Sequence, residues 1–386
     1  MKYQGGMRSF KQKIIESNFT QTQSKKSCFL FENILPKEQA APLAVEVIQD
    51  MKTMALDNYF QSKLFQKKSE WEILTELESL PELDQEYPWT LLVHHLDKYI
   101  PSMSDIIKHF NIFPKWSLDD VMGSYSTTNS VTPSHIDSYD VFLLQLSGKR
   151  SWSVQYSPKD DYQENQPLRI LKEFKPDETF HLEPGDMLYV PHGVAHEATT
   201  LETGLSLSIG IQALDLSQLL ISTLSADIKE FYLPKAKISQ AHSGSDSLMS
   251  QKDVVEIRNA VINQVLNKYH FDDALLTYLN QFQDPNKEQE DSIDLDKMNH
   301  EEFVEMFSTY PLYRTELSRF FALELDQGIK TAIGSEIYTI ERKTFEVLEH
   351  IFNQNLEFEI RMPEDSEALE IFYRYYLEDI FFFSID

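Results

Sequence analysis

Two histidines and one aspartate are the residues in this sequence best suited to bind a metal. His135 and Asp137 are two positions apart, so their side chains lie on the same face of an extended segment. His196 follows 61 residues later, in a segment of similar composition. Two imidazoles and one carboxylate occupy one face of an octahedral metal and leave three positions open, as in non-haem Fe(II) sites.

A further histidine, His192, competes with His196 for the third ligand position. The segment Pro191–Gly193 has the composition of a turn and contains His192, whereas His196 begins the next expected strand. His196 alternates with Ala198 and Thr200, whose small side chains leave room for a metal and its ligands. We therefore predict that His196 is the ligand. In the alternative, either histidine is a rim residue or makes only hydrogen bonds.

An arginine on an apolar strand face is the second feature that indicates chemistry. Arg150 shares strand parity with Trp152 and Val154, so it belongs to the inward face. A guanidinium inside a barrel costs free energy unless it meets an anion. A carboxylate bound through two parallel hydrogen bonds is its natural partner. The alternative is an ion pair with an internal acid.

The segments that carry these residues are expected to be strands. Between residues 121 and 213, short apolar runs alternate with turns such as Ser147-Gly148 and Pro184-Gly185, which is typical of a sandwich or small barrel. In the last run, LSLSIGI, the leucines and isoleucines share one face, and Ser206, Ser208 and Gly210 share the other. One side is expected to pack, while the other leaves space for a small acid.

Helical spacing of apolar residues precedes and follows this region. From Glu38 to Asp120 the spacing predicts helices, for example at Ala44, Val47 and Met51 and at Trp71, Leu74 and Leu77. The pattern returns at residues 216–232 and 254–282. An acidic linker at residues 283–300 then leads to a small module at residues 301–386.

Composition restricts the classes of function. The 386 residues include 35 Lys and Arg against 62 Asp and Glu, a net charge of −27 that disfavours nucleic-acid binding and favours a cationic partner. The single cysteine, Cys28, excludes an intrachain disulfide and an all-cysteine metal site. The N-terminal segment lacks the apolar region of a secretory signal, and no apolar stretch of the sequence is long enough to span a bilayer. We expect a cytoplasmic protein without membrane contact.

Together these residues make the sequence resemble the JmjC-type, cupin-fold 2-oxoglutarate oxygenases, and among them the bacterial ribosomal oxygenases. The resemblance covers about residues 114–215 and is carried by LDDVMGSYSTTNSVTPSHIDSYDVFLLQLSGKRSWSV, LEPGDMLYVPHGVAHEATT and LSLSIGIQA. It implies an α+β fold built on a double-stranded β-helix, the cupin or JmjC jelly roll, with helical decorations.

The resemblance also implies an order of domains. Residues 1–110 would form a mainly helical N-terminal part of the catalytic domain, and residues 111–215 the JmjC/cupin barrel. Residues 216–290 would form a helical dimerisation region, and residues 295–386 a winged-helix-like C-terminal domain. We therefore expect a homodimer, and the acidic character of the last domain argues against direct nucleic-acid binding.

Carried over by position, His135, Asp137 and His196 would be the catalytic iron ligands, and Arg150 would bind the distal carboxylate of 2-oxoglutarate. Ser206 lies where related enzymes often place an asparagine near the co-substrate, so it is a second candidate cofactor-binding residue. The implied cofactor is Fe(II), with 2-oxoglutarate and O2 as co-substrates. The implied activity is hydroxylation of a basic protein, a large-subunit ribosomal protein, with arginine as the expected target.

Two alternatives to this activity stay open. The same fold can demethylate methyl-lysine, and a cupin-like binding protein would not be an enzyme at all. The inward-facing Arg150 argues against a pure binding barrel, which has no need of an anion-binding residue. The loop Thr127–Ser134 departs from the bacterial relatives, which are typically glycine-rich there. The resemblance implies that this loop borders the substrate entrance, so the target residue is open.

Overall fold

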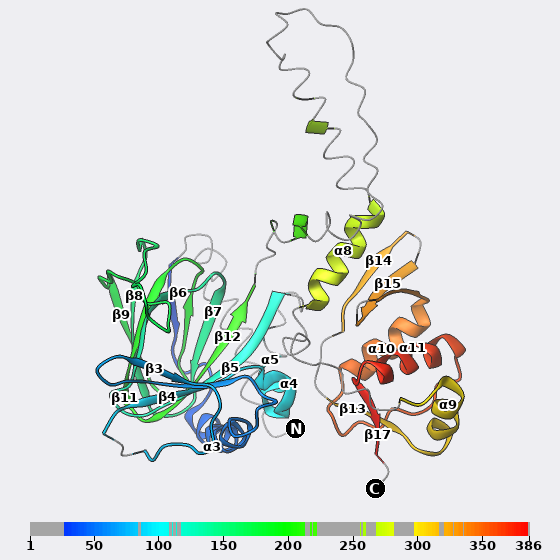
Figure 1. Cartoon of the computed structure of the whole chain (residues 1–386), viewed down its shortest axis with the longest axis horizontal. Helices are drawn as coiled ribbons and strands as arrows, with labels where there is room; N and C mark the ends of the chain where they lie inside the picture. Colours follow the sequence, from blue (N-terminus) through cyan, green and yellow to red (C-terminus); the bar gives the residue numbers. More distant parts are fainter. Residues whose placement is uncertain are drawn as a thin grey trace, which may run out of the picture. The chain divides into compact units, whose positions relative to one another are not determined.

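The chain divides into two compact units, Met1–Ala213 and Leu214–Asp386. The computed structural model describes residues 27–83, 86–107, 110, 113, 117–212, 217, 219–221, 255, 258–259, 268–281, 297–315, 320–326, 328–334 and 336–384. Figure 1 shows the first unit as a pair of sheets with helices beside them.

The larger sheet of the first unit has eight strands in the order β1-β10-β7-β12-β5-β4-β2-β3, and all its neighbours are antiparallel. In that order, the strands are Phe29–Phe31, Met187–Val190, Asp140–Gln145, Gly204–Ile211, Leu118–Ser126, Trp89–Val93, Ser62–Lys67 and Trp71–Leu74.

The smaller sheet has four antiparallel strands in the order β6-β11-β8-β9, which are Val131–Ile136, Ala195–Glu202, Lys149–Gln155 and Glu178–Leu182. Along the chain, the segments from β5 to β12 pass repeatedly between the two sheets. This is the connectivity of a double-stranded β-helix, so the predicted cupin-type barrel is confirmed.

The strand patterns follow from burial. All six residues of β7 are buried, whereas β8 alternates between half-buried and buried side chains along its seven residues. The predicted turn at Ser147-Gly148 is present, and Gly148 has a φ of 66°. A Cβ atom at Gly148 would lie 2.4 Å from the carbonyl oxygen of Glu202, so only glycine fits this position.

Strand β12 separates the main core from the barrel interior. Leu205, Leu207 and Ile209 are fully buried in a core that also contains Val47 and Met51 of helix α3 (Lys37–Met54). The hydroxyl-bearing residues of β12 alternate with them and so lie on the opposite face. The predicted division of this strand into one packing face and one small polar face is confirmed.

The helical prediction is correct for α3 and wrong for residues 62–93. Trp71 and Leu74 are the two ends of strand β3, which pairs with β2, and β2 pairs in turn with β4. Short apolar runs fit both periodicities, and here hydrogen bonding to the sheet decides between them. The N-terminal part is therefore mixed rather than mainly helical, with two further short helices, α4 (Leu96–Tyr99) and α5 (Pro101–Ile107).

The second unit contains two small antiparallel sheets and four helices among its described residues. The helices are α8 (Lys268–Gln281), α9 (His300–Thr309), α10 (Arg342–Phe352) and α11 (Ser366–Leu377). The strands β14 (Ala322–Leu325), β15 (Gly328–Ile333) and β16 (Glu336–Ile340) form one sheet, and β13 (Leu312–Arg314) pairs with β17 (Phe381–Phe383). Much of the predicted helical region 216–290 lies outside the described residues. No helix in the described part of the chain is long and apolar enough to cross a membrane.

The reactivity of the Cys28 thiol reports whether β1 is held in the sheet. Cys28 precedes β1 and packs in the core of the barrel, where burial raises the pKa of its thiol to about 12. We expect this thiol to resist a disulfide reagent at pH 8 in the folded protein and to react fully in urea, because the thiolate is the reactive form. Labelling kinetics measure this directly. A native rate equal to that of free cysteine would mean that β1 does not cover the thiol.

Candidate metal centre

Strand pairing brings the two predicted histidine ligands together. Strands β6 and β11 are antiparallel neighbours, and their register places His135 directly opposite His196. The two ring centroids are 4.2 Å apart. Asp137 immediately follows the last residue of β6. Sheet pairing therefore closes the 61-residue gap in sequence that separates the two imidazoles.

The three side chains converge on one point. The Nε2 atom of His135 lies 3.7 Å from Oδ1 of Asp137, and the Nε2 atom of His196 lies 3.5 Å from Oδ2 of the same carboxylate. One donor atom from each residue lies within 4.8 Å of the others. Among the described residues, this is the one group of three such side chains close enough to hold a metal ion.

The orientation of both imidazoles suits metal binding. The Nδ1 atom of His135 donates to the carbonyl oxygen of Pro133 at 2.8 Å, and the Nδ1 atom of His196 donates to that of Val194 at 3.2 Å. A carbonyl oxygen only accepts, so each Nδ1 carries the proton and each Nε2 presents a lone pair toward Asp137. This donor set fits a divalent transition metal.

Burial keeps His196 in the protonation state that ligation needs. Burial, assisted by the neighbouring His135, lowers the pKa of His196 to about 4. Its imidazole is therefore neutral at physiological pH, as a metal ligand must be. Whereas His196 is buried, the side chains of His135 and Asp137 are both partly exposed. The cluster is therefore closed on one side and accessible on the other.

His192 lies outside the cluster and is held by a different carboxylate. Its backbone N–H and its Nδ1 atom both contact Oδ1 of Asp140, at 2.9 and 3.0 Å. The hydroxyl of Tyr189 donates to the other oxygen of Asp140 at 2.8 Å. The side chain of His192 is 51% exposed. The structure thus brings His196 to the cluster and makes His192 a hydrogen-bonded rim residue.

Arg150 is buried in the barrel without an acidic partner. It is 2% exposed, and its Nη2 atom donates to Ser124 (carbonyl oxygen at 3.2 Å, Oγ at 3.1 Å) and to Oγ of Ser126. No carboxylate of the described residues forms an ion pair with it, and its Nε has no hydrogen-bond partner among them. Burial lowers its pKa to about 10, so the guanidinium stays charged at neutral pH. An uncompensated buried cation favours the anion site over the internal ion pair.

The register of β8 and β11 fixes where this cation lies relative to the His135–Asp137–His196 cluster. Thr200 of β11 is opposite Arg150, and His196 is opposite Val154. Four residues along a strand span about 13 Å between Cα atoms. The inward positions between these two rows are Ala198 and Trp152, which are opposite each other. The His135–Asp137–His196 cluster and the guanidinium thus lie at two ends of the same interior face of β8 and β11.

Ser206 lies inside the barrel, but its hydroxyl is engaged. It donates to Oε1 of Gln145 at 2.5 Å and lies opposite Ser124 in the pairing of β12 with β5. Ser124 and Ser126, which contact the guanidinium directly, were not predicted from the sequence as site residues. Their spacing of two within a predicted strand was the available signal, because it places both hydroxyls on one face.

The loop Thr127–Ser134 begins at the Arg150 end of the barrel rather than beside the metal ligands. The backbone N–H of Asn129 donates to the carbonyl of Thr200 at 2.8 Å, and the N–H of Thr200 donates to the carbonyl of Ser130 at 2.9 Å. A hollow of about 250 Å³ adjoins this stretch, with Lys67 and Trp71 among its other lining residues. The departure from the glycine-rich family pattern therefore begins near Arg150, at the end of the barrel where we expect an anion to bind.

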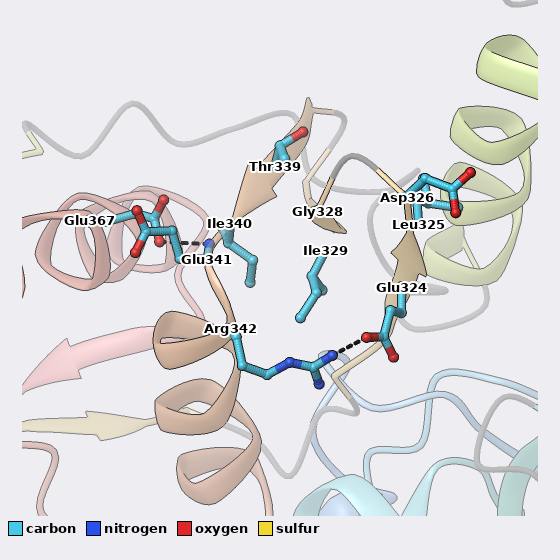
Figure 2. A pocket seen from close by; sticks show the side chains of 10 residues that line it. All are labelled: Glu324, Leu325, Asp326, Gly328, Ile329, Thr339, Ile340, Glu341, Arg342 and Glu367. Carbon is cyan, nitrogen blue, oxygen red and sulfur yellow. Dashed lines mark hydrogen bonds and ion pairs between the residues drawn. The ribbon is translucent and has the colours of Figure 1, made fainter.

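A hollow in the second unit has a different chemical character (Figure 2). Its volume is about 550 Å³, and four carboxylates and the guanidinium of Arg342 line it, with neither histidine nor cysteine. Arg342 pairs with Glu324, and Glu367 accepts the backbone N–H of Glu341 at 2.9 Å. These carboxylates make contacts within the unit, and the imidazole donors suited to a transition metal belong to the barrel.

Comparison with known proteins agrees with this site. Residues 105–219 match the family described as JmjC domain, so this part of the chain is a JmjC domain. A Haemophilus influenzae protein described as "Probable ribosomal oxygenase" is 28% identical over 210 residues, which cover 51% of this chain and 50% of that protein. The Escherichia coli "Ribosomal protein uL16 3-hydroxylase" is 33% identical over 132 residues, which cover 32% of this chain and 34% of that protein. The resemblance to ribosomal oxygenases is confirmed, although these alignments span only half or less of each relative.

Solved structures extend the likeness of fold to nearly the whole chain. The X-ray structure of E. coli YcfD superposes with a TM-score of 0.67 at 19% identity, covering 95% of this chain and 98% of that one. A structure of YcfD, a ribosomal oxygenase, in complex with cobalt and 2-oxoglutarate has a TM-score of 0.64, also at 19% identity and with the same coverage. The chain therefore shares the YcfD fold.

Paired alanine variants test which histidine binds the metal. We expect His196→Ala to weaken Co(II) binding by more than about a hundredfold, beyond the effect typical of losing an outer hydrogen-bond partner. His192→Ala, the matched control, should leave the affinity unchanged because the imidazole of His192 contacts Asp140 and does not belong to the cluster. Titration followed by Co(II) absorption measures both, with circular dichroism to verify folding. Equal losses in the two variants would contradict the assignment.

Proposed function

We propose that this chain is an Fe(II)- and 2-oxoglutarate-dependent oxygenase that hydroxylates a side chain of a ribosomal protein. The observation that carries the proposal is the presence of two sites in one barrel interior. The His135–Asp137–His196 cluster is at one end, and Arg150, a buried cation without an acidic partner among the described residues, is at the other. The names of the relatives and the YcfD complex with cobalt and 2-oxoglutarate support it.

Different residues of the barrel would bind the metal and the co-substrate. His135, Asp137 and His196 would hold Fe(II) on one face and leave three positions for other ligands. Bound iron, 2-oxoglutarate and O2 supply the oxygen-transfer chemistry. Arg150 would bind the distal carboxylate, with Ser124 and Ser126 fixing the plane of its guanidinium. The hydroxyl of Ser206 would act indirectly, through its contact with Gln145.

The proposed substrate is a basic segment of a large-subunit ribosomal protein, with arginine as the target residue. The net charge of −27 suits a cationic partner, and two of the three proposed ligands are accessible from solvent. The name of the Escherichia coli relative, a uL16 3-hydroxylase, supports uL16 as the substrate. For a ribosomal-protein substrate we propose a cytoplasmic location, because ribosomal proteins are made there.

The domain roles beyond the barrel are also proposals. Residues 111–215 would be the JmjC/cupin barrel, residues 216–290 would mediate homodimerisation, and residues 295–386 would form a winged-helix-like domain that does not bind nucleic acid. The helices α9 to α11 and the three-stranded sheet β14-β15-β16 supply elements that such a domain needs.

Turnover of 2-oxoglutarate tests the function. With Fe(II), we expect the protein to convert 2-oxoglutarate to succinate and to add one oxygen atom to one peptide of a set that tiles E. coli uL16. Asp137→Ala should lose both activities, because the cluster then retains only two ligands. Succinate assay and mass spectrometry measure the outcome. Formaldehyde release from a methyl-lysine peptide would favour demethylation, and absence of 2-oxoglutarate binding would refute the proposal.

Salt dependence tests whether charge attracts the substrate. A tenfold increase in ionic strength shortens the screening length about threefold, so KM for a basic peptide substrate should rise several-fold. KM for 2-oxoglutarate should change less, because the proposed contact at Arg150 is buried. Steady-state kinetics at two salt concentrations compare the two constants. A salt-insensitive peptide KM would mean that the −27 charge serves solubility alone.

A further inference from the structure

Trp152 is a buried tryptophan whose N–H has no hydrogen-bond partner. The side chain is 3% exposed, and its Nε1 atom meets no acceptor among the described residues. Buried donors in folded proteins are nearly always paired, so an unpaired one calls for a specific explanation. Trp89 of the same unit shows the usual situation, because its buried indole donates to the carbonyl oxygen of Glu82 at 3.1 Å.

The indole lies between the two ends of the proposed site. Its ring centroid is 5.7 Å from that of His196, and the Cζ atom of Arg150 is 6.0 Å from the ring. Val154 and Ala198, its neighbours on the interior faces of β8 and β11, have hydrocarbon side chains that offer no acceptor. The indole is therefore placed in the interior of the barrel, between the His135–Asp137–His196 cluster and the guanidinium.

A dicarboxylate held by the metal at one end and by Arg150 at the other must run alongside this indole. It would bring carboxylate oxygens, which are strong acceptors, into a region that otherwise has none for Trp152. The Nε atom of Arg150 is also unpaired, so one ligand would satisfy two buried donors on alternate residues of β8. A monocarboxylate of the same length would leave one end of this arrangement without its acceptor.

We propose that the Nε1–H of Trp152 donates a hydrogen bond to a carboxylate oxygen of 2-oxoglutarate and thereby positions the co-substrate. This inference rests on the proposed function and adds a residue that contributes to the preference for a dicarboxylic acid. Because the donor is fixed in the core of the barrel, it needs no rearrangement of a flexible side chain when the ligand binds.

The first test observes the indole directly in the full-length protein. The chain has four tryptophans, so ¹⁵N-tryptophan labelling gives few signals, and Trp152→Phe and Trp89→Phe assign two of them. In the Zn(II)-loaded wild type, 2-oxoglutarate should move the Trp152 Nε1–H resonance downfield and leave that of Trp89 nearly unchanged. If 2-oxoglutarate binds and the Trp152 signal stays in place, the inference is wrong while the proposed function stands. If the wild type binds no 2-oxoglutarate, the proposed function itself fails.

The second test measures affinity with a matched pair of variants. Trp152→Phe keeps an aromatic ring and removes the N–H, so Kd for 2-oxoglutarate should rise roughly tenfold, as expected for one hydrogen bond to a charged acceptor. Trp89→Phe removes an N–H that already has a protein acceptor and should leave this Kd unchanged. KM for the peptide substrate should not change in Trp152→Phe. An unchanged Kd in a folded Trp152→Phe protein would overturn the inference. If that variant does not fold, phenylalanine variants of the other three tryptophans assign the Trp152 signal by elimination, and the wild-type spectrum decides.

Discussion

The register of β11 between β6 and β8 is the constraint on which the rest of the site depends. One pairing sets His196 opposite His135, and the other sets Thr200 opposite Arg150. A slip of one residue would turn every one of these side chains to the other face of the sheet. The hydrophobic core resists such a slip, because Ala198 and Trp152 would exchange places with solvent-facing neighbours. The same packing that stabilises the barrel therefore sets the spacing between the His135–Asp137–His196 cluster and the guanidinium of Arg150.

Hydrogen bonding around the centre is complete where rigidity is needed and incomplete where a ligand is proposed to bind. The imidazoles of His135 and His196 are both fixed through Nδ1 by backbone carbonyls, and Asp140 fixes the rim residue His192. Two of the buried donors without a partner among the described residues, on Arg150 and Trp152, occur on alternate inward positions of one strand. Unsatisfied groups cost stability, and proteins tend to accept that cost at functional sites.

Much of the fold was predictable because strand alternation is a local property. The strands from residue 121 to residue 213, the inward face of Arg150 and the two faces of β12 all follow from residue types at spacing two. The helical prediction around Trp71 failed for the opposite reason. Strand β3 is defined by hydrogen bonds to β2, and β2 by those to β4, partners that a short local pattern cannot reveal.

The sequence by itself determined the donor types at the site, the shared face of His135 and Asp137, and the burial of a guanidinium that needs an anion. Only the tertiary structure decided that His196 joins the cluster while His192 pairs with Asp140, that Ser124 and Ser126 support Arg150, and that Trp152 is left with an unpaired donor. The physical reason is that some of these properties are local in the sequence and others depend on long-range contacts. The direction of a side chain depends on its own strand, whereas its partners depend on register between strands that are tens of residues apart.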